Sequence, residues 1–176
     1  MTMSKRSAGI LMYRRTGREL HLLLVHPGGP FWANKDDGAW SIPKGLFEDG
    51  EDPLRAAQRE FEEETGCVPA GEFLELGNFK QPSGKTIIAW GFEGNFEISR
   101  FKSNRFSMEW PPKSGQLQEF PEADRAEWFH PQEALRKILK GQAPIVTKLF
   151  QLLGYQPAAE RHDVAADDTN GQGSLF

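Results

Sequence analysis

The sequence predicts an α+β fold in which helices pack against a mixed β-sheet. Short apolar runs typical of strands alternate with stretches that carry helix signals, and Gly and Pro separate them. These segments do not follow the regular strand–helix–strand repeat of a doubly wound parallel sheet. The length of 176 residues, of which 38% are hydrophobic, suits one domain with a core of its own.

The strands are expected where β-branched and other apolar residues cluster between turn signals. Pro82-Ser83-Gly84 provides the turn of one predicted hairpin, and the Gly-, Pro- and Asp-rich segment His26–Gly38 predicts a loop. The predicted strands are Ala8–Tyr13, Leu20–Val25, Trp40–Ile42, Phe73–Lys80, Thr86–Phe92 and Trp128–Phe129.

The clearest helix is predicted over Pro53–Thr65. Asp52 suits the N-cap, Pro53 suits the first helical position, and Gly66 suits the C-terminal cap. An apolar stripe at spacings of three and four gives this helix one face to bury. The stripe consists of Leu54, Ala57 and Phe61, and further helices are expected at Gln132–Lys140 and Pro144–Leu153.

Composition narrows the classes of function. The net charge of −4 argues against general nucleic-acid binding, because neutralising phosphates requires a basic surface. The single cysteine, Cys67, allows no internal disulfide, which favours the cytoplasm. Apolar Ile10–Tyr13 is too short for a signal-peptide core, and no stretch approaches the ~20 apolar residues of a membrane span.

The domain is expected to occupy residues 7–155. Residues 156–176 contain few large apolar side chains and several acidic ones, so we expect a disordered acidic tail. A monomer or a homodimer is expected, with no membrane partner.

Three glutamates on the predicted helix point to chemistry. Glu60, Glu63 and Glu64 share one helix face, with neighbouring Cβ atoms about 5–6 Å apart, so their like charges repel. Mg²⁺ prefers oxygen ligands and would relieve this repulsion, and Arg59 can hold one of the carboxylates. The alternative interpretation is an acidic helix face that simply contacts water.

The preceding loop can contribute to the same site. Lys44-Gly45 offers a cation and a closely approaching backbone, and Gly50 allows a sharp turn into Glu51. Such a loop can bring a backbone carbonyl and the Glu51 carboxylate near one metal ion.

The whole segment Gly45–Cys67 resembles the signature of the Nudix hydrolases, G-x5-E-x7-R-E-U-x-E-E-x-G-U, where U is a bulky aliphatic residue. Each specified glycine, glutamate and arginine matches at the right spacing. Phe61 and Cys67 replace the usual aliphatic residues but remain apolar. The run Trp40–Gly45 also looks like the W-x-x-P-K-G sequence of dinucleoside polyphosphate hydrolases and some sanitising pyrophosphatases.

The resemblance implies a Nudix-type α/β/α sandwich with a mixed sheet. It also implies a hydrolase of nucleoside diphosphates linked to another moiety, with Mg²⁺ or Mn²⁺ as cofactor. The metal ligands that it implies are Glu60, Glu63 and Glu64, the carbonyl of Lys44, and Glu51 either as a ligand or as a supporting residue. Arg59 would orient the carboxylates.

The general base is open at this point, because some family members use a signature glutamate and others a glutamate from a later loop. Glu63 and Glu60 belong to the first kind, and Glu122 matches the second. Glu119 is the neighbouring alternative, and Glu122 can also be read as an ordinary polar loop residue.

The sequence suggests only a few residues that could contact the substrate. Phe31 or Trp32 can stack on a base, or both rings can cover the core. Lys44 and Lys85 can bind phosphates, and Arg105–Gln116 is a second candidate wall of the substrate site.

We therefore expect a metal-dependent pyrophosphohydrolase acting on a nucleoside polyphosphate or dinucleoside polyphosphate. The alternatives are a pyrophosphatase of diphosphoinositols or other non-nucleotides, and a non-catalytic module that senses a nucleotide.

Overall fold

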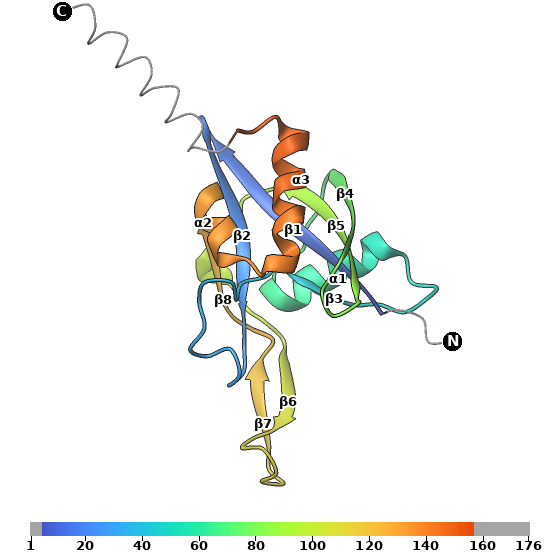
Figure 1. Ribbon diagram of the computed structural model, residues 1–176, viewed down its shortest axis with the longest axis vertical. Coiled ribbons are helices and arrows are strands. Elements are labelled where there is room, and N and C mark those ends of the chain that lie inside the picture. The colour runs from blue at the N-terminus through green and yellow to red at the C-terminus, as the bar shows by residue number, and fades with distance from the viewer. Residues whose placement is uncertain (1–4, 157–176) are drawn as a thin grey trace, which may run out of the picture.

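The computed structural model describes residues 5–156, which form a mixed sheet between helices (Figure 1). The single-domain expectation for residues 7–155 falls inside this range, whereas residues 157–176 of the expected tail 156–176 lie outside it. The sheet is built, in order, from β4 (Phe73–Lys80), β5 (Thr86–Glu93), β1 (Arg6–Thr16), β2 (Glu19–Pro27) and β8 (Ala123–Phe129), with the short β3 (Lys44–Leu46) paired to β1.

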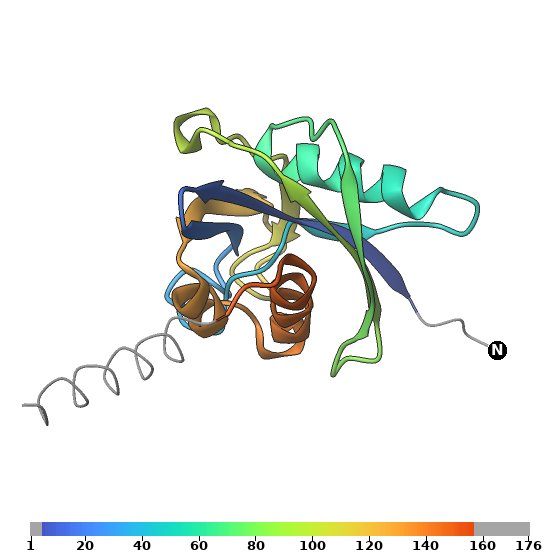
Figure 2. The same cartoon turned by 90° about the horizontal axis from the view of Figure 1, so that it is seen from above.

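Helices cover both faces of this sheet. Figure 2 shows α1 (Pro53–Thr65) on one side, and α2 (Pro131–Lys137) and α3 (Ala143–Leu153) on the other. β1 pairs in parallel with β5 and antiparallel with β2, so the sheet is mixed, as the sequence predicts. The predicted α/β/α sandwich is thereby confirmed.

The alternation of side chains along β1 divides the core into two halves. Ile10 and Met12 pack with Phe61 of α1, while Leu11 and Tyr13 pack on the opposite face with residues of α3. A strand with apolar residues on both sides must be buried on both faces, which explains why β1 lies in the middle of the sheet.

The predicted helix Pro53–Thr65 is confirmed at both ends. The Asp52 carboxylate accepts a hydrogen bond from the Arg55 N–H at 3.1 Å, and Gly66 adopts the left-handed conformation with φ 81°. Local capping interactions therefore set the limits of α1.

The expected strand Trp40–Ile42 is wrong. Only isolated bridges form there, between Val25 and Ser41 and between Trp40 and Ile138, and the Ile42 N–H donates to the side chain of Gln142. The apolar side chains of Trp40 and Ile42 are buried in the core without being part of a strand. The strand in this region, β3, begins at Lys44, directly after Pro43.

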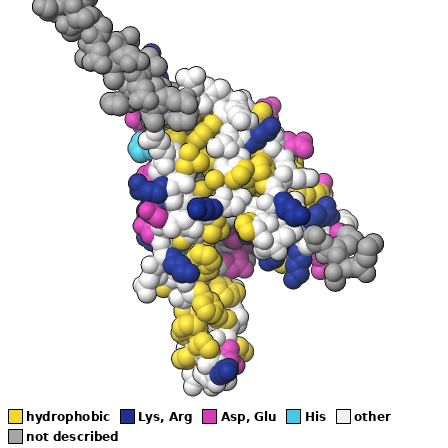
Figure 3. All heavy atoms as spheres, in the orientation of Figure 1, with side chains coloured by type: hydrophobic (Ala, Val, Ile, Leu, Met, Phe, Trp, Pro, Cys, Tyr) yellow, Lys and Arg dark blue, Asp and Glu magenta, His cyan; other side chains and the backbone are white. Residues whose placement is uncertain are grey.

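A hairpin beyond the main sheet was not predicted. β6 (Arg105–Glu109) and β7 (Leu117–Pro121) pair only with each other in the described part of the chain and project from the domain (Figure 1). The segment Arg105–Gln116 therefore belongs largely to this hairpin. Apolar side chains gather on its surface in the space-filling view (Figure 3).

Two other boundaries differ from expectation. β8 starts at Ala123, and α2 ends at Lys137 because Leu139 donates its N–H to the Trp40 carbonyl at 2.8 Å instead of continuing the helix. Within residues 5–156, no helix has both the length and the apolar character needed to cross a membrane.

Candidate active site

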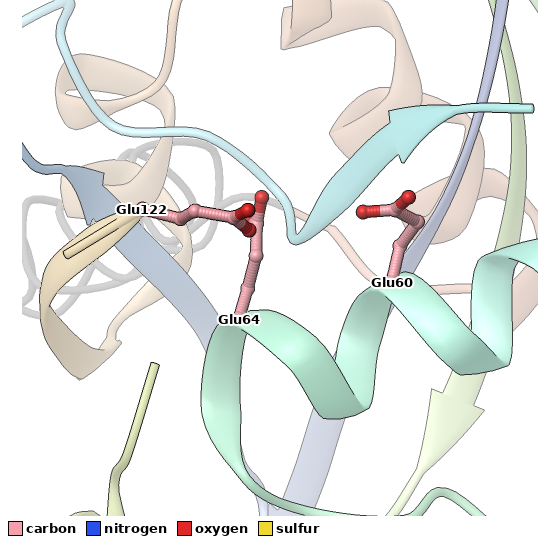
Figure 4. A group of neighbouring side chains, drawn as sticks. All are labelled: Glu60, Glu64 and Glu122. Atoms are coloured by element: carbon pink, nitrogen blue, oxygen red, sulfur yellow. The ribbon is translucent and has the colours of Figure 1, made fainter. Parts of the chain in front are cut away.

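Three carboxylates from two parts of the chain meet at one end of α1. Glu60 and Glu64 lie one turn apart on α1, and Glu122 immediately precedes β8. One carboxylate oxygen from each lies within 4.8 Å of those of the other two. Glu64 and Glu122 point toward each other in Figure 4, with Glu60 farther along the helix. We call these three residues the carboxylate cluster.

The close approach of β3 to α1 explains why residue 45 is a glycine. A Cβ atom at Gly45 would overlap the carboxylate of Glu60, which is only 8% exposed. The neighbouring Lys44 N–H donates to Glu64 Oε1 at 3.4 Å. The backbone of β3 therefore forms one wall of the carboxylate cluster.

The pKa values of all three residues of the cluster are raised. Burial raises the pKa of Glu64 to about 8, and the nearby Glu122 and Glu60 carboxylates add to the rise. Burial also raises the pKa of Glu60 and of Glu122, with the Glu63 carboxylate as a further cause in each case. A divalent cation among these oxygens would favour their ionised forms, so the donor set fits the metal that the sequence leads us to expect.

Arg59 holds a second group of acidic residues beside the cluster. Its guanidinium lies 3.1 Å from Glu51, 2.9 Å from Glu60 and 3.3 Å from Glu63. The hydrogen bonds that Arg59 donates to the Glu51 carboxylate are the main reason why the pKa of Arg59 is raised. Glu51 and Glu63 thus contact Arg59 and lie outside the group of Glu60, Glu64 and Glu122, whereas Glu60 belongs to both.

Backbone contacts bring Glu122 to α1. Its N–H donates to the Asn104 carbonyl at 2.7 Å, and its own carbonyl accepts from the Gly28 N–H at 3.0 Å. A Cβ at Gly28 would overlap the Pro121 carbonyl, so only glycine allows this approach. The alternative base, Glu119, lies on β7 and pairs with Arg105 at 3.7 Å, away from the cluster.

Sequence reasoning missed Gly28 and Asn104 as the residues that position Glu122. Gly28 could have been noticed as one of two adjacent glycines in the loop, whereas nothing in the sequence around Asn104 distinguishes it from other loop residues. The Asn104 N–H in turn donates to the Glu63 carbonyl at 2.7 Å, which ties this segment to the end of α1.

The carboxylate cluster opens into a cleft of about 490 Å³. Trp32, Lys44 and Phe106 are among its other lining residues, and Phe106 was not singled out individually from the sequence. Phe31 does not line it, because its ring packs 5.4 Å from that of Trp110. Lys85 lines an adjoining cavity together with Lys44.

The loop that carries Trp32 is held by a buried histidine. His26 Nδ1 lies 2.8 Å from the Asp124 carboxylate, and Nε2 lies 2.6 Å from the Lys35 carbonyl. His26 is 0% exposed, so it has no access to substrate. Its contacts connect the start of the loop, the segment after Trp32 and the beginning of β8.

Comparison with known proteins agrees with this architecture. Residues 3–149 match the family model of the NUDIX domain. The chain is 31% identical over 127 residues to Nudix hydrolase 25 of Arabidopsis thaliana, covering 66% of this chain and 72% of that protein. It is 28% identical over 166 residues to an RNA pyrophosphohydrolase of Brucella anthropi, covering 82% and 88%.

A solved structure shows the same fold. A C. elegans Ap4A hydrolase binary complex aligns with a TM-score of 0.59 at 21% identity, covering 85% of this chain and 98% of that chain. At this level of identity, the likeness concerns the fold alone.

Proposed function

The chain belongs to the NUDIX family and is a hydrolase of that family, and from this premise we propose that it is a metal-dependent pyrophosphohydrolase. Its proposed substrate is a nucleoside polyphosphate or dinucleoside polyphosphate, cleaved in the diphosphate linkage. The observation that carries the proposal is the carboxylate cluster, with oxygens within 4.8 Å of one another, beside Lys44 in an open cleft.

The proposed cofactor is Mg²⁺, or Mn²⁺ in its place. Glu60, Glu64 and Glu122 would hold it, and Glu63 and the Lys44 carbonyl are further candidates. When bound, the cation offsets charge on phosphate oxygens and lowers the pKa of coordinated water. Arg59 would keep Glu60 and Glu63 oriented toward the cleft, because it contacts both.

We assign proton abstraction from the attacking water to Glu122, which would use its second carboxylate oxygen, since only one oxygen of each glutamate belongs to the carboxylate cluster. The Glu63 carboxylate forms an ion pair with Arg59, whereas no Lys, Arg or His of residues 5–156 lies within salt-bridge distance of Glu122. Glu122 also faces Glu64 from across the cleft rather than from the same helix (Figure 4). The Lys44 ammonium, close to Glu64 and Glu60, would attract the phosphates.

A named relative supports a nucleotide substrate. This relative, 28% identical to this chain, is called an RNA pyrophosphohydrolase. We also propose a cytoplasmic location, because the chain has a single cysteine, and a monomeric or dimeric state.

A substrate panel with Mg²⁺ tests the proposal. Nucleoside triphosphates, dinucleoside polyphosphates, 5′-triphosphorylated RNA and a diphosphoinositol would be assayed for release of phosphate, pyrophosphate and nucleotide. Glu64→Gln serves as the inactive control. Hydrolysis of the diphosphoinositol alone would favour a non-nucleotide pyrophosphatase, and tight nucleotide binding without turnover would favour a sensing module.

A further inference from the structure

A larger cavity of about 730 Å³ adjoins the catalytic cleft. Trp32 and Lys44 line both the cavity and the cleft, so one extended ligand can occupy the two spaces together. The residues that line the cavity come from β1, β3, β5, the β4–β5 turn, the Trp32 loop and the segment between α2 and α3. They include Trp32, Lys44, Lys85, Leu139 and Lys140.

The charge of this cavity is opposite to that of the carboxylate cluster. Lys44, Lys85 and Lys140 line it, and no Asp or Glu does. Within the described residues, none of the three lysines has a carboxylate at salt-bridge distance. The arrangement suits a ligand that carries phosphates.

The walls between these lysines are largely apolar. The half-buried Trp32 ring and the half-buried Leu139 side chain offer surface for a flat organic group. A bare phosphate chain would gain nothing from such walls, whereas a nucleoside would bury its base against them. The volume is within the usual range of about 300–1,000 Å³ for small-molecule sites.

The side-chain amides that line the cavity are already engaged within the protein. Gln142 accepts from the Ile42 N–H at 3.0 Å and donates to Ser41 Oγ at 2.9 Å. Gln81 donates to the Gly141 carbonyl at 2.9 Å. Amides held in this way are poorly placed to read the edge of a base, so stacking would dominate over base-specific hydrogen bonds.

We propose that this cavity binds the nucleoside phosphate on the far side of the cleaved linkage, with little discrimination between bases. This inference rests on the proposed pyrophosphohydrolase function and narrows its substrate to a dinucleoside polyphosphate or a similar compound with an organic group at each end. The phosphates lie by Lys44, Lys85 and Lys140, and the base lies on Trp32 and Leu139.

Binding without metal tests the cavity separately from catalysis. ADP, GDP, UDP and inorganic tripolyphosphate would be titrated calorimetrically into the full chain in the presence of a chelator. We expect Lys85→Gln and Lys140→Gln each to weaken ADP binding by about three- to tenfold, because each removes one phosphate contact of a solvent-exposed lysine. Lys148→Gln on α3, which makes the same charge change outside the cavity, should leave binding unchanged.

The nucleotide part of the proposal has its own readout. ADP should bind more tightly than tripolyphosphate in spite of its smaller charge, and ADP, GDP and UDP should differ by less than about tenfold, since stacking tolerates all bases. Tighter binding of tripolyphosphate would overturn the nucleoside assignment. Strong preference for one base would overturn the lack of discrimination.

Kinetics separates this proposal from the function on which it rests. With a dinucleoside polyphosphate and Mg²⁺, Lys85→Gln and Lys140→Gln should raise KM and leave kcat nearly unchanged. Hydrolysis with an unaltered KM in both variants, together with unaltered ADP binding, would overturn the cavity assignment while the hydrolase function stands. If the unmodified chain hydrolysed none of the substrates but still bound ADP in a way that depends on these lysines, the proposed hydrolase function would be wrong and the cavity assignment would stand.

Discussion

Single residues determine the electrostatics of the site. The carboxylate cluster combines burial with mutual repulsion, which is why the pKa values of all its members are raised. The protein keeps these groups together although uncharged side chains would fold more easily there. Such a cost in stability is typical of residues that bind a cation or act on a substrate.

Neutralising one member should separate activity from folding. Glu60→Gln, Glu64→Gln and Glu122→Gln should each lower kcat by at least about 100-fold, since each removes a metal ligand or the base. The melting temperature of the metal-free protein should stay the same or rise, because repulsion is relieved. Both quantities would be measured by steady-state kinetics and calorimetry with a chelator.

The matched control is Glu62→Gln, an exposed glutamate on the same helix that is not part of the cluster. It should leave kcat close to that of the unmodified protein. If the cluster variants kept their activity and melted substantially earlier than the control, the metal-site assignment would be wrong.

The stability of the metal-free protein should fall as the pH rises. The pKa of Glu64 is about 8 in the folded protein, compared with 4.5 for an ordinary glutamate. Between these values the folded state holds a proton that the unfolded state has lost, so the stabilising contribution is complete below about pH 4.5 and disappears as the pH rises through 8. Glu60 and Glu122 act in the same direction.

Melting curves recorded with a chelator between pH 5 and pH 9 measure this effect. The unmodified protein should lose several degrees over that range, on the order of 5 °C or more for a domain of this size, and Glu64→Gln should lose less. An identical pH dependence in the two proteins would contradict the assignment of a raised pKa to Glu64.

At the level of elements, the site depends on how closely β3 approaches α1. Neither element alone contains the cleft. The backbone of β3 passes against the Glu60 carboxylate, and only the absence of a side chain at Gly45 allows this. The same principle operates at Gly28, where the backbone before the Trp32 loop touches Pro121. Gly45 thus sets the distance between β3 and α1, and Gly28 sets the distance between the start of the Trp32 loop and the end of β7.

Gly45→Ala should disable the site without unfolding the domain. The added methyl group meets the far end of the Glu60 side chain, which can turn away, so the loss of stability should be small, on the order of 1 kcal/mol. Metal affinity and kcat should fall because Glu60 is displaced. Both would be measured, together with the free energy of unfolding in urea.

A double-mutant cycle tests whether Gly45→Ala lowers kcat by displacing Glu60. If Gly45→Ala acts through Glu60, adding it to Glu60→Gln should lower kcat little further, because the two changes remove the same ligand. Fully additive losses would show that Gly45 acts on the substrate or on Lys44 instead.

For the molecule as a whole, a bound cation should connect parts of the chain that are distant in sequence. The carboxylate cluster joins α1 to the residue before β8, and Glu122 is bonded through its backbone to Asn104 and Gly28. Stabilisation by a ligand at this point should therefore extend beyond α1.

Mg²⁺ at about 100 times its dissociation constant should stabilise the folded state by about 2.7 kcal/mol. For a domain of this size that corresponds to a rise in melting temperature on the order of 5–10 °C. Hydrogen exchange should slow at the amides of Lys44, Gly28 and Glu122, and change little in the β6–β7 hairpin. Protection confined to α1 would show that Glu122 does not share the metal.

The sequence by itself determined the parts that depend on neighbours along the chain. Asp52 and Gly66 limit α1 through contacts within a few residues, and the spacing of Glu60 and Glu64 places them on one helix face. The family signature and the mixed-sheet fold followed from these local patterns. These patterns can be recognised in the sequence because a helix forms its backbone hydrogen bonds between residues that are close in the chain.

Only the tertiary structure decided which residues join the glutamates of α1. The sequence suggested Glu63 as a metal ligand or base and Glu51 as a metal ligand or supporting residue, and it suggested Glu122, or its neighbour Glu119, as the general base. The fold places Glu51 and Glu63 at Arg59, Glu119 at Arg105, and only Glu122 with Glu60 and Glu64. It also places Trp32 in the cleft and Phe31 on the hairpin, although the two are adjacent in sequence. The physical reason is that pairing across the sheet closes long loops, and which partners meet depends on the packing of the whole core rather than on any local segment.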